Sequence, residues 1–308
     1  MKVTILGCGV YGLALATSFL EKNNQIFMWS KFDEEVQNLK EKYFHITFST
    51  DLDIATRDSD LIVIAIPVAF LDETMQSYQK FYHGEDILIA SKGIETKEQR
   101  FAYEIVQKYL KNAPIGVISG GTFAQDMHDK KVMGLTLATK INSIEKKVKI
   151  GLESSFLKVQ YSHDLIGVSV CGAIKNVMAI GFGMLDGASY PPSSRFLFLT
   201  KAIYEIRDFI SLLGGNPDTI MTYAGIDDIM MTCTSSQSRN YTLGKLIGEK
   251  ANSQKIEEYK QNTTIEGLGT SKAIFSLAKK NNIVLPFSSI IYKILYESVD
   301  VRDLIHLL

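Results

Sequence analysis

Residues Val3–Gly12, which read VTILGCGVYG, decide the fold of this 308-residue chain. A short β-branched strand runs directly into Gly7, Gly9 and Gly12, and an apolar helix pattern, Leu13–Leu20, follows. A GxGxxG turn between a strand and a helix is typical of a dinucleotide-binding βαβ unit. Gly7 would allow the tight turn, Gly9 would let the backbone approach a pyrophosphate, and Gly12 would let the helix pack on the strand. The helix N-terminus would face the phosphates with its amide groups.

The rest of the N-terminal half alternates strand and helix patterns. Further strands are predicted at Gln25–Trp29, Leu61–Ile66, Asp86–Ala90, Ile115–Ser119, Met133–Ala138 and Leu157–Ser162. Continuous apolar runs such as Leu61–Ile66 are typical of central parallel strands. We therefore expect an α/β fold with a doubly wound, Rossmann-type sheet over residues 1–164. Ligands of such sheets bind outside the carboxyl ends of the strands, where Pro67, Lys92 and the segment Gly120–Ala124 fall.

The end of the second strand bears on the choice of cofactor. Sites that select NAD usually carry Asp or Glu there to bind the ribose 2′-hydroxyl. This chain has Lys31 instead, and the nearest acid is Asp33. A lysine at this place would tolerate or favour a 2′-phosphate, so the pattern predicts NAD or NADP without deciding between them. The alternative is that Lys31, and likewise Lys92, is an ordinary solvated lysine.

After Asp164 the pattern becomes helical, and we expect an all-helical C-terminal domain over residues 165–308. The first helix places Lys175 and Asn176 at the centre of an apolar run. Lysine is almost never fully buried without a partner, a ligand or a reaction, so Lys175 is a candidate functional residue. The predicted helices are Leu165–Leu185, Arg195–Leu213, Pro217–Met231, Leu243–Glu249, Lys255–Gln261, Thr270–Asn281 and Phe287–Glu297.

A membrane span is the alternative for Leu165–Leu185, since about twenty apolar residues can cross a bilayer. A lysine at the midpoint would cost roughly 2.5–3.5 kcal/mol on insertion scales. The helix also contains Gly172, Gly181 and Gly183, and the chain has no second span of this kind. We therefore interpret the segment as a buried helix, and we expect the site to lie between the two domains.

Composition excludes several classes of function. With 33 basic and 34 acidic residues the net charge is −1, which gives no indication of binding to nucleic acid or to a membrane surface. The three cysteines lack metal-ligand spacing and the five histidines are scattered, so no metal site is expected. The N-terminus enters a strand without a charged leader, so the expected compartment is the cytoplasm.

An ordered series of motifs runs along nearly the whole chain. The series comprises Gly7-x-Gly9-x-x-Gly12, Ser91-Lys92-Gly93, Ser119-Gly120-x-Thr122-Phe123-Ala124, Cys171–Asn176, Ala224–Asp228, Thr232–Ser235, Ser238–Asn240 and Glu266-Gly267. In this order it resembles bacterial-type NAD(P)-dependent glycerol-3-phosphate dehydrogenase. The resemblance implies reversible hydride transfer between NAD(P)H and dihydroxyacetone phosphate. The product, sn-glycerol 3-phosphate, would feed glycerophospholipid synthesis.

The resemblance also implies roles for individual residues. Lys175 would be the catalytic acid/base, with Lys92, Asp228 and Thr232 at the reacting centre. The substrate would contact Lys92, Gly120, Thr122, Lys175, Asp228, Ser238, Arg239 and Asn240, of which Arg239 and Asn240 would hold the phosphate. The cofactor would contact Gly7, Gly9, Val10, Tyr11, Gly12, Lys31, Pro67, Lys92, Ala124, Arg239, Thr264 and Glu266.

The residue types suit that chemistry. Hydride delivery to a ketone leaves an alkoxide, which needs a proton donor within hydrogen-bond reach. Burial and a second cation, Lys92, would both lower the pKa of Lys175 from about 10.4, and Asp228 would restore charge balance. Asp228 and Thr232 are four residues apart, so they share a helix face, although such a pair can also be a cap or a solvated face. Arg239 has the planar fork that suits a phosphate, although it could equally be a surface arginine.

Two other functions remain open at this point. The chain departs from the family pattern at Gly121, Thr264 and the segment 188–201, where Ser193 and Lys201 stand in place of the usual asparagine and arginine. It could therefore be a dehydrogenase for another small hydroxyacid, whose carboxylate would use the same arginine fork. It could also be a dinucleotide-binding sensor without catalytic activity. The aromatic and apolar surface of the C-terminal helices could support a homodimer.

Overall fold

A computed structural model describes residues 1–308, and the chain divides into two compact units. Unit 1 comprises Met1–Lys92 and Ala102–Leu165, and unit 2 comprises Gly93–Phe101 and Ile166–Leu308. The segment Gly93–Phe101, which the sequence pattern put in the first domain, thus groups with unit 2. It is a short loop closed by one antiparallel bridge between its two ends.

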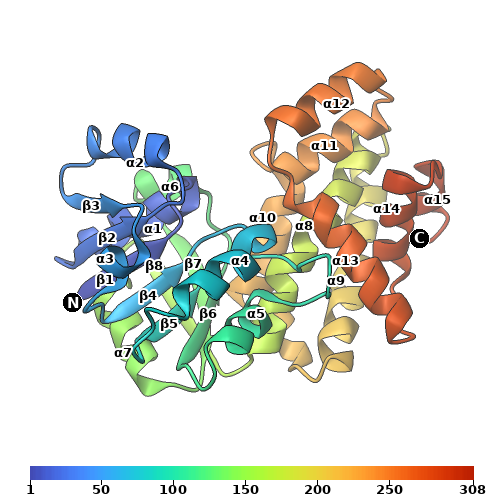
Figure 1. The fold of residues 1–308 in the computed structure, drawn as a ribbon. Helices are drawn as coiled ribbons and strands as arrows, with labels where there is room; N and C mark the ends of the chain where they lie inside the picture. The colour runs from blue at the N-terminus through green and yellow to red at the C-terminus, as the bar shows by residue number, and fades with distance from the viewer. The chain divides into compact units, whose positions relative to one another are not determined.

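Unit 1 is built on an eight-stranded sheet in the order β3-β2-β1-β4-β5-β6-β7-β8 (Figure 1). The strands are β1 (Lys2–Leu6), β2 (Gln25–Trp29), β3 (Ile46–Ser49), β4 (Leu61–Ile64), β5 (Asp86–Ile89), β6 (Ile115–Ser119), β7 (Met133–Thr139) and β8 (Leu157–Ser162). Neighbouring strands pair in parallel except β6 and β7, which are antiparallel. Because β1 pairs with both β2 and β4, the winding direction reverses there, at the kind of switch point where α/β sheets bind ligands.

Helices connect the strands of unit 1. They are α1 (Val10–Leu20), α2 (Asp33–Lys40), α3 (Leu52–Thr56), α4 (Val68–Tyr78), α5 (Ala102–Tyr109), α6 (Ala124–His128) and α7 (Asn142–Gly151). The apolar faces of β1, β4 and α1 are fully buried, with Ile5, Val63 and Leu15 all at 0% exposure. The expected doubly wound, Rossmann-type sheet is therefore confirmed.

Unit 2 is helical apart from the loop Gly93–Phe101. Its elements are α8 (Leu165–Gly187), α9 (Pro192–Leu212), the 3₁₀ helix η1 (Pro217–Met221), the π-helix η2 (Tyr223–Asp227), α10 (Asp228–Thr234), α11 (Arg239–Gly248), α12 (Ser253–Asn262), α13 (Glu266–Lys280), α14 (Pro286–Tyr296) and α15 (Arg302–Ile305). Helix α8 is long and apolar enough to cross a membrane, but 83% of its most apolar window is buried inside the protein. Burial of this extent is that of a core helix.

One helix prediction in unit 2 was wrong, and three helices begin three or four residues before the predicted position: α9 at Pro192, α11 at Arg239 and α13 at Glu266. The segment Pro217–Met231 is not one helix but η1, η2 and the start of α10. One break falls at Thr222, whose ψ of 174° is extended. A second falls at Gly225, whose φ of −90° and ψ of −108° are not helical and whose Cβ, if present, would lie 2.1 Å from the Ile220 carbonyl oxygen. Helix α9 begins at Pro192 rather than Arg195, because a proline in the first turn is already set to the helical φ.

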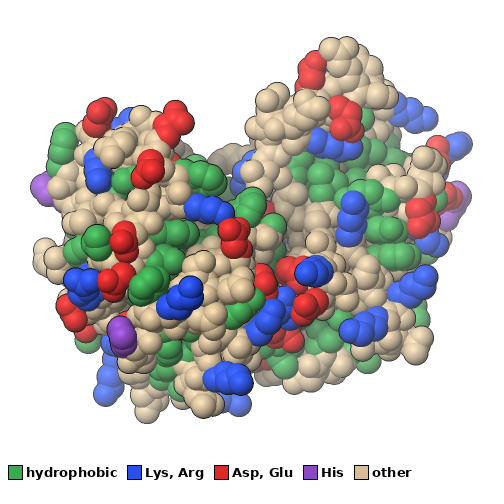
Figure 2. Space-filling model, in the orientation of Figure 1, with side chains coloured by type: hydrophobic (Ala, Val, Ile, Leu, Met, Phe, Trp, Pro, Cys, Tyr) green, Lys and Arg blue, Asp and Glu red, His purple; other side chains and the backbone are tan.

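On the face shown in Figure 2, charged side chains are distributed without a large patch of one sign. Figure 2 shows Lys and Arg interspersed with Asp and Glu on the visible face of each unit. This distribution agrees with the net charge of −1. An anionic ligand must therefore be bound by local groups rather than by the field of the whole protein.

Candidate active-site residues

The glycine turn of unit 1 has the geometry that a dinucleotide needs. Gly7 has φ +114°, and a Cβ on it would lie 2.6 Å from the Ala65 carbonyl oxygen. A Cβ on Gly12 would lie 2.2 Å from the Gly7 carbonyl oxygen, whereas one on Gly9 would meet nothing within 4 Å. The first and third glycines are therefore required by packing, and the second leaves the backbone open to a ligand.

The N-terminus of α1 fits a pyrophosphate. Gly9 is the N-cap residue, no side chain caps the helix, and the first turn carries no acidic residue. The first amide groups of a helix lack partners within the helix, and the helix dipole adds partial positive charge there. The residues present therefore fit NAD or NADP, whose phosphates would lie against Gly9, Val10 and Tyr11.

Predicted site residues that follow β5 and β6 lie close to one at the start of α1. Lys92 Nζ donates a hydrogen bond to the Gly120 carbonyl oxygen at 3.2 Å and lies 5.5 Å from the centre of the Tyr11 ring. The Tyr11 hydroxyl and Thr122 Oγ1 are buried and have no hydrogen-bond partner in the protein. Buried polar atoms normally have partners, so these two indicate a place for a polar ligand.

The other predicted residues of unit 1 differ in their surroundings. Pro67 is exposed and is the N-cap residue of α4, directly after Ile66. Ala124 is half-buried at the start of α6. Lys31 is exposed and forms an ion pair with Glu73 on α4, with Nζ and Oε1 2.6 Å apart. The prediction for Lys31 concerned a 2′-phosphate, and the residue is engaged with a carboxylate instead.

A buried ion pair lies at the centre of unit 2. Lys175, on α8, donates a hydrogen bond from Nζ to Asp228 Oδ1 at the start of α10. Thr232 Oγ1 donates to the same oxygen at 3.2 Å, as expected for residues one helical turn apart. Lys175 is 6% exposed and Asp228 is 0% exposed. A charge buried to this extent is costly unless it is paired, so Asp228 compensates the ammonium group of Lys175.

An amide network connects this pair's helix to two other elements. Asn240 Nδ2 donates to Asn176 Oδ1 at 2.9 Å, and Asn176 Nδ2 donates to Glu266 Oε2 at 3.1 Å. Asn240 Oδ1 in turn accepts from the Gly267 amide at 2.9 Å. Glu266 and Asn240, predicted as separate contact residues, are thus joined through Asn176. No role was assigned to Asn176 from the sequence, although an amide beside Lys175 in an apolar run was the signal for one.

The predicted phosphate-binding residues stand at the N-terminus of α11. Ser238 is its N-cap residue and accepts a hydrogen bond from the Tyr241 amide at 3.2 Å. Arg239 occupies the first helical position and is exposed, so its guanidinium is open to an anion. Thr264 is also exposed, two residues before α13 begins.

A second ionic cluster holds α11 against α8. Asp186 Oδ2 accepts from the Tyr241 hydroxyl and lies 3.2 Å from Lys245 Nζ, and Asp186 Oδ1 accepts from Arg195. Burial would raise the pKa of Asp186, but the hydrogen bonds from Tyr241 and Lys245 and the Arg195 charge together lower it. Burial, reinforced by Asp186, raises the pKa of Tyr241 to about 12. This cluster fixes the helix that carries Arg239 and Asn240.

Cys233 is a further residue beside the buried pair. Burial raises the pKa of its thiol, the Lys175 charge opposes this rise, and the Asp228 charge adds to it. The thiolate is the reactive form of cysteine. Cys233 is therefore an inert neighbour of the lysine and not a second nucleophile.

The fold and these residues define an NAD(P)-dependent dehydrogenase with a Rossmann-type unit and a helical unit. Residues 2–145 match the family model for the N-terminus of NAD-dependent glycerol-3-phosphate dehydrogenase, and residues 164–306 match the model for its C-terminus. The chain therefore belongs to the NAD-dependent glycerol-3-phosphate dehydrogenase family.

Individual relatives agree along the whole length. The chain is 30% identical to glycerol-3-phosphate dehydrogenase [NAD(P)+] of Staphylococcus aureus, over 98% of this chain and 96% of that protein. It is 29% identical, with the same coverage, to the enzyme of that name from Staphylococcus saprophyticus. The crystal structure of glycerol-3-phosphate dehydrogenase from Coxiella burnetii superposes with a TM-score of 0.93, at 26% identity, over 99% of this chain and 97% of that one.

Proposed function

We propose that this chain catalyses the reversible, NAD(P)-dependent interconversion of dihydroxyacetone phosphate and sn-glycerol 3-phosphate. The observation that carries the proposal is the buried Lys175–Asp228 pair in a chain whose two halves both match the family. A protein that only bound a dinucleotide would have no evident need for an ammonium group at 6% exposure. The pair therefore argues for catalysis rather than for a sensor.

Lys175 is the proposed proton donor. When bound, the reduced dinucleotide would supply the hydride that converts the substrate carbonyl group to an alkoxide. Lys175 Nζ donates a proton to that oxygen. When Lys175 gives up its proton and becomes an amine, Asp228 keeps its negative charge. This charge favours the ammonium form of Lys175, so it helps the amine to take a proton back from solvent. Thr232 donates to the same carboxylate oxygen and fixes its orientation. In the oxidation direction the amine of Lys175 removes the hydroxyl proton.

The remaining residues bind the substrate and cofactor in this proposal. Arg239, with Ser238 and Asn240, holds the substrate phosphate, because a guanidinium can donate two parallel hydrogen bonds to it. Lys92, Gly120 and Thr122 contact the substrate, and Lys92 adds positive charge where the alkoxide forms. Unit 1 is the proposed dinucleotide-binding domain, and unit 2, which includes Gly93–Phe101, is the proposed substrate domain. The enzyme works in the cytoplasm as a source of glycerophospholipid precursor, and a homodimer formed through the C-terminal helices belongs to the same proposal.

The test is oxidation of NADH or NADPH, followed by absorbance, with dihydroxyacetone phosphate as substrate. We expect turnover with this ketone and none with pyruvate, an unphosphorylated ketoacid. Lys175→Met should lower kcat by about 100-fold or more, the range for loss of a general acid, while binding of the dinucleotide is retained. Arg239→Met should chiefly raise KM. Lys272→Met, which changes an exposed lysine on α13, is the matched control and should leave both constants unchanged.

Each alternative function has its own result in this assay. Turnover of the ketoacid in preference to the phosphorylated ketone would identify a different hydroxyacid dehydrogenase. Binding of the dinucleotide without oxidation in the presence of either substrate would identify a sensor. A Lys175→Met protein with wild-type kcat would remove Lys175 from the mechanism even if the reaction itself is the proposed one.

A further inference from the structure

Helix α2 places an acidic residue, Glu35, against the end of the second strand. The strand β2 ends at Trp29, and neither Ser30 nor Lys31 is acidic. Ser30 Oγ, however, donates a hydrogen bond to Glu35 Oε2, and it also accepts one from the Phe32 amide at 3.2 Å. The Glu35 carboxylate is thereby held back against the end of β2, although the residue itself belongs to the first turn of α2.

The same carboxylate lies beside the glycine turn. Burial, and then the negative charge of Glu35, raise the pKa of the Cys8 thiol to about 12. Cys8 is the second residue of the turn, directly before Gly9, and β1 and β2 are paired neighbours up to Leu6 and Trp29. Glu35 therefore stands across the ends of β1 and β2, where the adenosine ribose of a dinucleotide lies in this class of fold.

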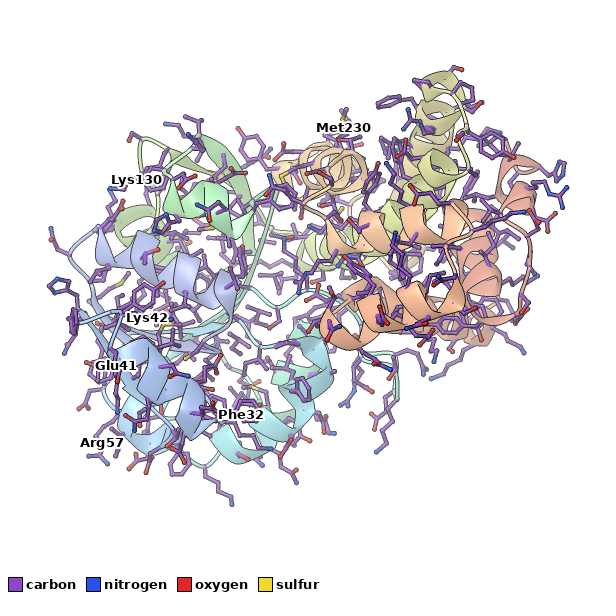
Figure 3. All side chains as sticks on the ribbon, turned by 90° about the horizontal axis from the view of Figure 1, so that it is seen from above. Phe32, Glu41, Lys42, Arg57, Lys130 and Met230 are labelled. Carbon is purple, nitrogen blue, oxygen red and sulfur yellow. The ribbon has the colours of Figure 1, made fainter.

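An open groove occupies this place. It has a volume of about 490 Å³ and is lined by Cys8, Phe32, Glu34, Glu35, Asn38 and Leu39. Its lining thus contains two carboxylates and one amide but no basic residue. Phe32 is 65% exposed and stands at the N-terminal end of α2, where a flat apolar ring suits the face of an adenine (Figure 3).

Lys31 does not offset these charges within the groove. Its Nζ is 2.6 Å from Glu73 Oε1 on α4, and the Lys31 side chain is 60% exposed. The groove is therefore lined by the carboxylates of Glu34 and Glu35, and the ammonium group of Lys31 is paired with Glu73. A 2′-phosphate carries close to two negative charges, so it would be repelled there, whereas a ribose hydroxyl can donate to a carboxylate.

We propose that Glu35 accepts a hydrogen bond from the ribose 2′-hydroxyl and makes this chain select NAD(H) over NADP(H). The inference rests on the proposed function, and it chooses between the two cofactors that the name of the relatives, glycerol-3-phosphate dehydrogenase [NAD(P)+], leaves open. Lys31 is consequently a partner of Glu73 rather than a site for a 2′-phosphate.

The test is a binding measurement that does not depend on turnover. Isothermal titration calorimetry would compare ADP-ribose with 2′-phospho-ADP-ribose, which differ only in the phosphate. We expect ADP-ribose to bind at least about tenfold more tightly, since a hydrogen bond to a charged group is lost and a repulsion is gained with the phosphorylated probe. Glu35→Gln keeps an acceptor for Ser30 but removes the charge, and it should reduce this preference several-fold.

Three further measurements distinguish the effect of the Glu35 carboxylate from a general effect of negative charge. Glu41→Gln removes one charge from the opposite end of α2 (Figure 3) and should leave the preference unchanged. Glu73→Gln releases Lys31 and should strengthen binding of the phosphorylated probe only, and adding Lys31→Met to that variant should cancel the gain. In the unaltered protein, added salt should reduce the preference, because screening weakens repulsion. The salt measurement uses only the unaltered protein, so its result does not depend on whether a variant folds.

The outcomes that would overturn the inference are distinct from those that concern the reaction. Equal or tighter binding of 2′-phospho-ADP-ribose by the unaltered protein would overturn it while leaving the proposed function intact. An unchanged preference in Glu35→Gln would overturn the assignment of Glu35. If neither probe bound, the groove would not be an adenosine site, and the proposed function would fall with the inference.

Discussion

At the scale of single residues, Asp186 illustrates how a carboxylate outside the proposed reacting centre can fix the position of a proposed substrate-binding residue, Asn240. It accepts hydrogen bonds from Arg195 and from Tyr241, and Tyr241 follows Asn240 directly on α11. Asn240 in turn bonds Asn176, the neighbour of Lys175. The position of the proposed phosphate-binding helix therefore depends on a charged group that never has to touch the substrate.

Asp186→Asn is expected to destabilise unit 2 in a pH-dependent way. At neutral pH the loss should be about 1.5–3 kcal/mol, the usual contribution of hydrogen bonds to a charged group. The pKa of Asp186 is lowered from its ordinary value of 3.8, so its stabilising effect is present above that value and is lost as pH falls through the folded pKa. Urea unfolding followed by circular dichroism at several pH values should therefore show the wild-type and variant free energies converging in acid.

Asp300→Asn is the matched control in the same unit. Arg302 hydrogen bonds lower the pKa of Asp300 to about 2, but the pair lies on the surface, where ion pairs add little stability. Its unfolding curve should overlay that of the unaltered protein at neutral pH. A constant difference between Asp186→Asn and wild type from neutral pH down to strong acid would contradict the role given to the Asp186 charge.

At the scale of elements, α8 and α11 are in contact through their backbones. A Cβ on Gly183 would lie 2.1 Å from the Tyr241 carbonyl oxygen, and one on Gly244 would lie 2.0 Å from the Ile180 carbonyl oxygen. The same closeness recurs one turn further on at Gly187 and Gly248. Glycines spaced at one helical turn thus let the helix that carries Lys175 approach the helix that carries Arg239.

Gly244→Ala should therefore lower the free energy of unfolding by about 1–3 kcal/mol, because the added methyl group overpacks the contact. Gly269→Ala on α13 is the matched control, since its Cβ would meet only Thr96 Cγ2 at an ordinary 3.7 Å. The control should be neutral or gain up to about 1 kcal/mol from helix propensity. Urea unfolding followed by circular dichroism would compare the two, and equal effects of both substitutions would refute the close contact.

The elements that could be predicted from the sequence are those whose pattern is local. Apolar runs located β2, β6 and β8 at their observed bounds, and the four-residue spacing of Asp228 and Thr232 placed both on one face of α10. The strand β3 (Ile46–Ser49) was missed, because four residues with two buried side chains carry too little pattern.

Features that depend on contacts distant in the sequence could not be predicted. The break at Gly225 depends on the nearby Ile220 backbone, and a glycine inside a helical pattern gives little warning of it. The position of Glu35 depends on a hydrogen bond from Ser30 that turns the side chain back toward β2. From the sequence, the nearest acid at the strand end was Asp33, and Glu35 was overlooked for this reason.

At the scale of the whole molecule, only unit 1 has a fluorescent reporter of its own. The single tryptophan, Trp29, lies in β2 of unit 1, is 8% exposed and donates from Nε1 to the Thr50 carbonyl oxygen at 2.9 Å. Tryptophan fluorescence therefore follows the unfolding of the sheet that carries the glycine turn. Unit 2 has no tryptophan, and circular dichroism follows the helices of both units together.

Saturation with NAD+ should raise the thermal midpoint seen by Trp29, because a ligand that binds only the folded state stabilises it by mass action. At 100 times the dissociation constant the gain is about 2.7 kcal/mol, which corresponds to roughly 5–10 °C for a domain of this size. The oxidised cofactor is the right probe, since it lacks the long-wavelength absorbance of NADH that overlaps tryptophan emission. Nicotinamide mononucleotide, which lacks the adenosine half, should produce a much smaller shift at the same concentration. An unchanged midpoint with NAD+ would mean that the turn at Gly7–Gly12 does not bind the dinucleotide in the folded protein, whatever its backbone geometry.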